Sequence, residues 1–263
     1  MPEGLDGVID QRTINMQASL AIMPGSLSAD TVRCRRLDVN EKDSYLLPDP
    51  SYVSFVDDFI HGSGVASGTV GELGWNFYTD ASSTLTAYTG EANHPGAVYI
   101  TALGASGIGS LYANAAAYSL LNGVKEYRQV WWIRDPTTNV GDNDVRFGIL
   151  DNVSYSAHTN AIYFELDASG GVSATNWVAQ TTSASSATST DTGVAWANAV
   201  YHKFEIWYTP AAVKFYINGA LVATHTTNIP TTSDMQPCWS MQRVAANRNC
   251  VLDYYSMTMK VAR

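Results

Sequence analysis

The sequence predicts an all-β protein, a two-sheet antiparallel sandwich preceded by an N-terminal extended arm. Three observations predict this fold. The stretch Tyr201–His225 alternates apolar and polar residues with the period of two that is typical of a half-buried strand. Short strand patterns separated by turn residues fill the chain from residue 51 to residue 263. Tyr, Trp, Thr and Val are abundant while Lys, Glu and Leu are scarce, which favours strands over helices.

The clearest element is a pair of strands and a hairpin within Tyr201–His225. Alternate residues of the first strand fall on two sides: Val200, His202, Phe204, Ile206 and Tyr208 on one, and Tyr201, Lys203, Glu205 and Trp207 on the other. Thr209-Pro210 interrupts this strand, because proline has no N–H to give to a central ladder. Val213–Ile217 resumes the extended pattern. Asn218-Gly219 then predicts a tight hairpin turn, from which Leu221–His225 returns.

The other strands are expected at short intervals along the chain. In order, they are Tyr52–Ile60, Asn76–Tyr78, Gly96–Leu103, Gly109–Ala113, Tyr127–Arg134, Val145–Leu150, Ala161–Asp167, Thr175–Gln180, Pro237–Val244 and Asn249–Val261. Ala113–Leu121 is the one plausible helical turn. Thr181–Thr192 is a polar, low-complexity run that fits either a long exposed loop or a pair of weak edge strands.

Residues 1–50 differ in composition from the β-sandwich domain expected over residues 51–263. They hold four prolines and the basic cluster Arg33, Arg35 and Arg36, and they show little sustained alternation. Such a segment does not bury a core of its own. We expect an arm that docks on another surface; a disordered leader or a segment packed loosely on the main domain is the alternative.

Charge and cysteine usage narrow the class of protein. The net charge of −9 argues against binding to nucleic acid or to an anionic membrane, since both need basic patches. No secretory signal is expected, and no stretch approaches the roughly 18 apolar residues of a membrane span. Cys34, Cys238 and Cys250 are widely spaced, so free thiols in a reducing cytosol are expected. Pairing of Cys238 with Cys250 is the alternative if their strands are neighbours.

Two carboxylates, Glu165 and Asp167, lie two residues apart on one strand and therefore on one face of it. Glycoside hydrolysis uses two carboxyl groups roughly 5–10 Å apart, which alternate strand residues provide. A catalytic E-x-D-x-x-E strand needs a third carboxylate at position 170, where this chain has Gly170. Structural or solvated carboxylates are therefore favoured, and no catalytic residue is assigned.

Metal and cofactor chemistry finds little support in the sequence. Asp135, Asp142, Asn143 and Asp144 put oxygen ligands in one loop, which makes calcium the alternative to an ordinary polar turn. Their spacing fits no EF-hand. The histidines show neither metalloprotease spacing nor an accompanying nucleophile elbow, so no cofactor is expected.

The tryptophans are candidate contact residues, because aromatic faces stack on sugars and anchor interfaces. Trp131 and Trp132 are adjacent on a strand and point to opposite sides, so one of them looks outward or lies under a loop. Trp131, Trp132 and Trp177, with Glu165 and Asp167, are the candidate glycan or interface contacts.

From about Phe55 onward the chain resembles the concanavalin A-like lectin/glucanase jelly roll in its laminin-G-like form. The resemblance is carried by Asp57-Asp58-Phe59, Arg146-Phe147-Gly148-Ile149, the HKFEIWY…VKFYINGALVATHTTNIP hairpin and the closing VLDYYSMTM strand. It implies the fold and says little about function, because this fold hosts lectins, glucanases, lyases and structural modules.

A chain of this kind is also similar to domains of tailed-bacteriophage virion proteins. That likeness implies a non-enzymatic virion protein, made in the host cytoplasm without a signal peptide, such as a capsid decoration or head-fibre protein. The arm with Arg33, Arg35 and Arg36 would attach it to the major capsid protein or another virion protein, as a homotrimer with the jelly roll facing outward. The alternative is a tail or appendage protein that binds or degrades host surface polysaccharide.

Overall fold

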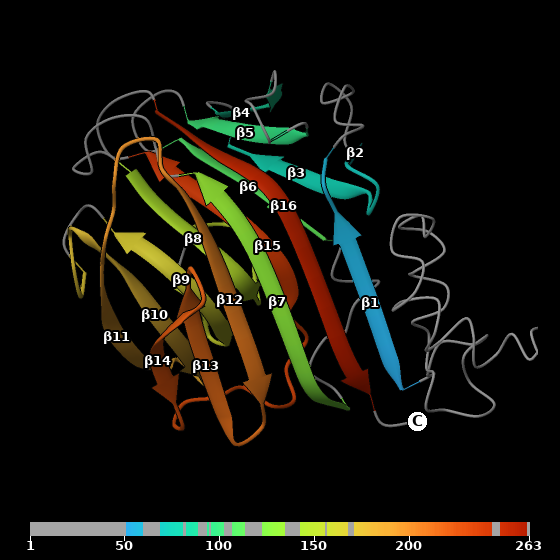
Figure 1. Cartoon of the computed structure of the whole chain (residues 1–263), viewed down its shortest axis with the longest axis vertical. Coiled ribbons are helices and arrows are strands. Elements are labelled where there is room, and N and C mark those ends of the chain that lie inside the picture. The colour runs from blue at the N-terminus through green and yellow to red at the C-terminus, as the bar shows by residue number, and fades with distance from the viewer. Residues whose placement is uncertain are drawn as a thin grey trace, which may run out of the picture. The chain divides into compact units, whose positions relative to one another are not determined.

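The structure is a computed structural model that describes residues 51–59, 69–80, 83–88, 94, 96–102, 107–113, 123–134, 143–155, 157–167, 171–243 and 248–261 (Figure 1). The predicted arm over residues 1–50, including Arg33, Arg35 and Arg36, lies outside this range. So do most of the predicted helical turn at residues 113–121 and most of the acidic loop at residues 135–144.

The described residues form antiparallel strands in two sheets, which confirms the predicted all-β sandwich. The strands are β1 (Tyr52–Asp57), β2 (Thr69–Val70), β3 (Trp75–Thr79), β4 (Ser83–Tyr88), β5 (Ala97–Ala102), β6 (Ile108–Tyr112), β7 (Val124–Arg134), β8 (Asn143–Leu150), β9 (Ala161–Asp167), β10 (Asn176–Ser183), β11 (Ser186–Ala195), β12 (Tyr201–Thr209), β13 (Ala212–Ile217), β14 (Ala220–His225), β15 (Gln236–Arg243) and β16 (Arg248–Val261). Among the described residues, no helix is long and apolar enough to span a membrane.

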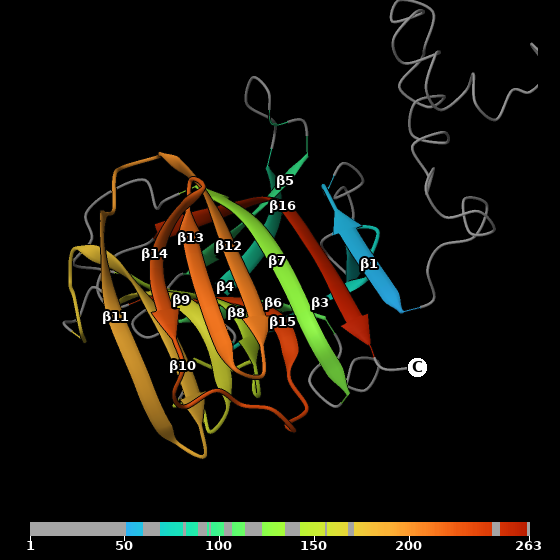
Figure 2. The ribbon, with the colours of Figure 1, turned by 60° about the horizontal axis from the view of Figure 1, so that its bottom comes forward.

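Each sheet mixes strands that are far apart in the sequence. Sheet A has the order β14-β13-β12-β7-β16-β5-β4, and β1 also pairs with β16. Sheet B has the order β11-β10-β9-β8-β15-β6-β3-β2. Strands β12, β7, β16 and β1 run side by side across the nearer sheet of Figures 1 and 2. The edges of the two sheets meet where β14 contacts β11.

The core lies between the sheets and is rich in aromatic side chains. Trp131 of sheet A packs on Phe147 of sheet B with ring centroids 5.8 Å apart, and Phe204 packs on Phe147 at 4.7 Å. Trp177 meets Phe204 at 4.8 Å. Such pairs, in tilted or edge-on arrangements, stabilise the sandwich beyond the area they bury.

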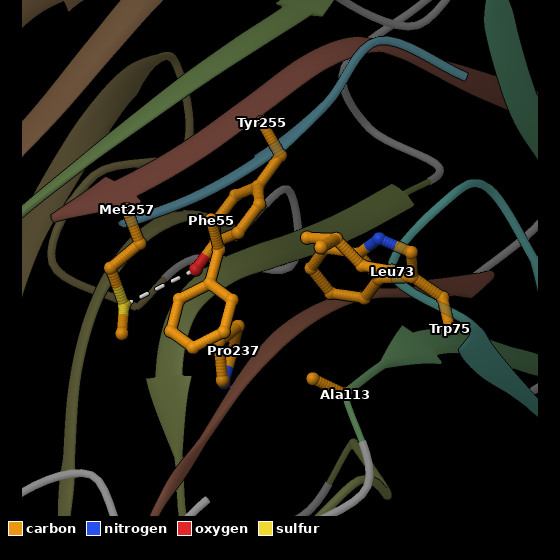
Figure 3. Close-up of a pocket in the computed structure, with 7 residues that line it drawn as sticks. All are labelled: Phe55, Leu73, Trp75, Ala113, Pro237, Tyr255 and Met257. Carbon is orange, nitrogen blue, oxygen red and sulfur yellow. Dashed lines mark hydrogen bonds between the residues drawn. The ribbon is translucent and has the colours of Figure 1, made fainter. Parts of the chain in front are cut away.

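A small apolar cavity remains between the sheets (Figure 3). It measures about 10 Å³ and is lined by Phe55, Leu73, Trp75, Ala113, Pro237, Tyr255 and Met257. A water molecule needs at least that volume together with polar partners. The nearby Tyr255 hydroxyl is 3.3 Å from Met257 Sδ and is used within the wall. The cavity is a packing gap and offers no ligand site.

Asp57 explains why the first strand is shorter than predicted. Its carboxylate accepts hydrogen bonds from the Phe59 N–H at 2.9 Å, the Leu73 N–H at 3.0 Å and the Trp75 indole N–H at 3.0 Å. These bonds bend the chain after Asp57, so the strand expected over Tyr52–Ile60 stops there. Gly71, at φ 70°, passes so close that a Cβ would collide with this carboxylate.

The polar run Thr181–Thr192 forms the last three residues of β10 and most of β11, a pair of strands at the edge of sheet B. Of the two predicted alternatives, the edge strands are therefore correct. Ala184 and Ser185 turn between them with φ of 48° and 65°. Strands β2 and β4 were missed by the sequence analysis. Cys238 and Cys250 are buried thiols that form no disulfide, as expected, and burial raises the pKa of the Cys238 thiol.

Candidate functional site

The outer face of sheet A carries a groove that follows β7 between its neighbours β12 and β16. Alternation along β7 points Tyr127, Trp131 and Ile133 into the core, so Arg128, Val130 and Trp132 face outward. The groove consists of three adjoining depressions of about 380, 490 and 390 Å³. The first and the second share Arg128 as a wall, and the second and the third share Trp132 and Tyr254. From Glu126 to Trp132, β7 advances about 20 Å.

The central depression exists because small side chains form its floor. Val130 lies opposite Ser256 of β16 in the ladder, and Thr258 lies opposite Arg128. The next pair along the strands is Trp132 and Tyr254, two half-buried aromatic rings that form one wall. Lys203 of β12 lies opposite Trp132 on the other side. The floor is therefore open to a ligand, with rings at one end and cations beside it.

A charge cluster borders this depression. Glu205 Oε2 accepts hydrogen bonds from Nε of Arg128, at 3.0 Å, and from its Nη2, while Glu205 Oε1 receives Lys203 Nζ at 2.6 Å. The Glu205 side chain is only 7% exposed, but that of Arg128 is 58% exposed. Burial raises the pKa of Glu205, but the hydrogen bonds from Lys203 and Arg128 outweigh burial and hold the pKa below its usual range.

One end of the groove lies around Trp207, which is exposed. Its indole N–H donates to Glu126 Oε1 at 2.9 Å, and Lys214 Nζ lies 5.3 Å from the ring centroid. Tyr216 and Gly219 complete the wall of this depression with Glu126 and Trp207. The indole is therefore held in place by a hydrogen bond and a cation–π contact.

The other end of the groove is formed by His94 and Asp253. His94 Nδ1 lies 2.7 Å from Asp253 Oδ2, and the His94 ring stacks on Tyr201 at 3.9 Å with 7° between the planes. The register of β16 against β7 shifts between Leu252 and Tyr254. This bulge inserts Asp253 as an extra residue, which brings its side chain to the groove beside Tyr254.

The outer face of sheet B carries a second polar cluster, and a segment of the chain covers it. Arg146 Nε donates to Glu165 Oε1 at 2.6 Å, and the Tyr155 hydroxyl donates to the same oxygen at 3.2 Å. The Arg146 guanidinium lies 3.9 Å from the Tyr155 ring centroid. The Ser110 hydroxyl donates to the Val153 carbonyl at 2.6 Å, which holds the segment 151–155 on this face.

Burial shapes the titration of this second cluster. Burial lowers the pKa of Arg146, but the neighbouring Tyr155 and Glu165 raise it by a larger amount, so the net shift is upward. Burial raises the pKa values of Tyr155 and Tyr163. Arg146 thus stays charged against Glu165, and the two tyrosines stay neutral.

The structure separates the predicted contact residues. Trp131 and Trp177 are fully buried in the core, which corrects their prediction as contacts, because a side chain without exposed surface does not touch an external ligand. Trp132 lies in the groove, as the argument from alternation allowed. Glu165 and Asp167 share a face of β9, but Glu165 is buried beneath the 151–155 segment and on the other sheet from Trp132.

The groove residues Arg128, Glu205, Trp207 and Tyr254 were not singled out from the sequence. The alternation in Tyr201–His225 already placed Glu205 and Trp207 on one side, but the pairing of β7 with both β12 and β16 carries no local sequence signal. Among the described residues, no group of three or more His, Cys, Asp or Glu side chains is arranged to hold a metal ion.

Comparison with solved structures shows the fold alone. A protein of unknown function, SO2946 from Shewanella oneidensis MR-1, matches with a TM-score of 0.55 and 16% identity over 81% of this chain and 88% of its own. A glycoside hydrolase family 16 endo-glucanase from Bacteroides ovatus matches with a TM-score of 0.54 and 12% identity over 77% of this chain and 99% of its own. The described domain therefore has the concanavalin A-like lectin/glucanase jelly-roll fold.

The sequence comparisons give a narrower result. No curated protein matches the chain. The family described as "SO2946-like, C-terminal domain" matches residues 93–243, which include β5 to β15 and the β7–β12 wall of the groove. Because this match spans more than half of the sequence, the chain belongs to the SO2946-like C-terminal domain family.

Proposed function

We propose that this protein binds a carbohydrate chain along the outer face of sheet A and does so without catalysis. The observation that carries the proposal is the groove itself, in which aromatic rings lie on both sides of an open floor of small side chains. Trp132 and Tyr254 border one end and Trp207 and Tyr216 the other. Aromatic faces pack against the apolar faces of sugar rings, and the polar groups between them hydrogen-bond hydroxyls.

The non-enzymatic part of the proposal is supported by the surroundings of the carboxylates. Glu165 has one oxygen held by both Arg146 and Tyr155, and its side chain is 10% exposed. Glu205 has both oxygens held by cations. A glycosidase needs one carboxyl group free to donate a proton and another free to reach the sugar.

The test measures binding of the full chain to soluble polysaccharides by affinity electrophoresis, with mixed-linkage β-glucan and uronate-containing polymers in the panel. Trp132→Ala and Tyr254→Ala are expected to weaken binding to every bound polymer. Tyr78→Ala is the matched control, because Tyr78 is a half-buried aromatic residue of sheet B. If no polymer is retarded, or if Trp132→Ala binds as the parent does, the proposal fails.

Catalysis is tested on the same polymers. We expect no release of reducing ends after prolonged incubation. Release that disappears in Glu165→Gln would replace the binding proposal by a glycosidase acting at the face of sheet B.

A second proposal concerns where the protein acts, and its support comes from the sequence. Residues 1–50 differ in composition from the jelly roll and hold the cluster Arg33, Arg35 and Arg36. We propose that this segment attaches the domain to a virion, as a decoration, head-fibre or appendage protein. Removal of residues 1–50 should abolish attachment to particles, which labelled antibody and electron microscopy detect. Normal decoration by the truncated protein would refute the proposal.

A further inference from the structure

The centre of the groove is positively charged although the chain as a whole carries −9. The charged residues that line the central depression are Arg128 and Lys203, and the buried carboxylate between them is Glu205. One negative charge therefore faces two positive charges. Because both Glu205 oxygens already accept hydrogen bonds, Glu205 positions the two cations and leaves one net positive charge at the depression.

Both cations keep donors for a ligand. A guanidinium has five N–H donors and an ammonium has three. Arg128 gives Nε and Nη2 to Glu205, and Lys203 gives one donor to it. Arg128 remains 58% exposed. Since the carboxylate already holds both side chains, a ligand that binds them loses less conformational entropy than with free side chains.

Each end of the groove holds a carboxylate. Glu126 lies at the Trp207 end, with Oε1 accepting the indole N–H. Asp253 lies at the other end, paired with His94. Carboxylates accept hydrogen bonds from sugar hydroxyls and repel other anions. Each carboxylate has a basic neighbour, since Lys214 lies over the Trp207 ring and His94 pairs with Asp253. The groove thus offers a cationic centre between two ends without excess positive charge, which suit uncharged, hydroxyl-rich groups.

We propose, on the basis of the carbohydrate-binding function above, that the groove selects a glycan in which an acidic sugar is bordered by neutral sugars. The carboxylate of the acidic sugar binds Arg128 and Lys203 above Val130 and Ser256. A neighbouring ring packs on Trp132 and Tyr254, and the flanking neutral sugars reach Glu126 and Asp253. A polymer with a carboxylate on every sugar fits less well, because its outer carboxylates lie beside Glu126 and Asp253, where the basic neighbours are already engaged.

The ligand-side test compares matched polymers at low and high salt. Gellan and xanthan carry uronates separated by neutral sugars; their carboxyl-reduced forms keep the backbone without the charge; polygalacturonate carries a carboxylate on every sugar. We expect gellan or xanthan to bind at least about tenfold more tightly than its reduced form and than polygalacturonate, the range expected for a charged hydrogen bond. Salt should reduce that difference.

Each other outcome has a separate meaning. Equal binding of the native and carboxyl-reduced polymers would overturn the acidic-sugar inference and leave the carbohydrate-binding function standing. Tighter binding of polygalacturonate would overturn the requirement for neutral neighbours. Binding to none of the polymers, charged or reduced, would overturn both the inference and the proposed function.

The protein-side test uses Arg128→Gln and Lys203→Gln in the full chain. Each should weaken binding of native gellan or xanthan by at least about tenfold and weaken binding of the reduced polymer much less, because only the native polymer presents a carboxylate to the lost cation. Trp132→Ala should weaken both forms alike. Lys125→Gln, which removes an exposed cation from β7 outside the groove, is the charge-matched control. Unaltered discrimination in both groove variants would refute the assignment.

Discussion

The outer faces of the two sheets each carry an arginine–glutamate pair on neighbouring strands, in opposite surroundings. Arg128 and Glu205 join β7 to β12 on sheet A, and Arg146 and Glu165 join β8 to β9 on sheet B. The glutamates are similarly buried, but the Arg128 side chain is 58% exposed and the Arg146 side chain 15%. The first pair borders an open depression, and the second lies against Tyr155 of a covering segment.

The same ionic contact has different consequences on the two sheets. On sheet B, Tyr155 and the Arg146 guanidinium both donate to one oxygen of Glu165, and the cluster holds the 151–155 segment to the sheet. On sheet A, Glu205 is the partner of both cations within the described part of the chain, and the largely exposed Arg128 retains donors toward solvent. Whether an arginine of such a pair can still donate to a ligand therefore depends on how exposed its guanidinium is. The ion pair itself is present on both sheets.

Breaking the sheet B pair should give the largest effect on stability. Arg146→Ala leaves Glu165 buried without its cation, and loss of one partner of a buried pair costs about 3–5 kcal/mol of unfolding free energy. Urea denaturation of the variant and the parent at pH 7 measures the difference. The double variant Arg146→Met, Glu165→Leu should recover a large part of the loss, because no unpaired charge remains. A loss below about 1 kcal/mol in Arg146→Ala would show that the pair behaves as a surface pair.

His225, at the place where the edges of the two sheets meet, should have an intermediate effect on stability that depends on pH. His225 of β14 is buried, with Nδ1 at 3.0 Å from the Thr181 hydroxyl and Nε2 at 2.9 Å from the Thr190 hydroxyl. Burial lowers the pKa of His225 below the ordinary value. The unfolded chain therefore binds this proton at a higher pH than the folded chain does.

The sign of the pH dependence follows from linkage. Stability is fully present above the unfolded pKa, about 6.5, and is lost as the pH falls below it, by at most ~1.4 kcal/mol per pH unit for one proton. The midpoint of urea denaturation should therefore be lower at pH 5.5 than at pH 7.5. Burial also lowers the pKa of His158, so His225→Gln should reduce this dependence without removing it. An unchanged dependence in His225→Gln would contradict the role given to His225.

The sequence predicts much of the fold because period-two patterns are local. Ala161–Asp167 was predicted with the bounds that β9 has, and the Asn218-Gly219 turn joins β13 to β14 as expected. The site was harder to predict, because it depends on which strands become neighbours. Trp131 and Trp132 illustrate the limit: alternation requires that they point to opposite sides, but only the ladder with Tyr254 and Lys203 shows which ring faces the groove.

Arg128→Gln should give the smallest effect on stability and thereby sharpen the contrast with Arg146. Its guanidinium is mostly solvated, and Lys203 still pairs with Glu205 in the variant, so we expect the unfolding free energy to fall by less than about 1 kcal/mol. Urea denaturation at pH 7, with Lys125→Gln as the control for lost surface charge, measures this. A fall of more than about 2 kcal/mol would mean that Arg128 supports the fold as Arg146 does. The Arg128 guanidinium would then be needed for the stability of sheet A, and a loss of glycan binding in the same variant would no longer report on a direct contact.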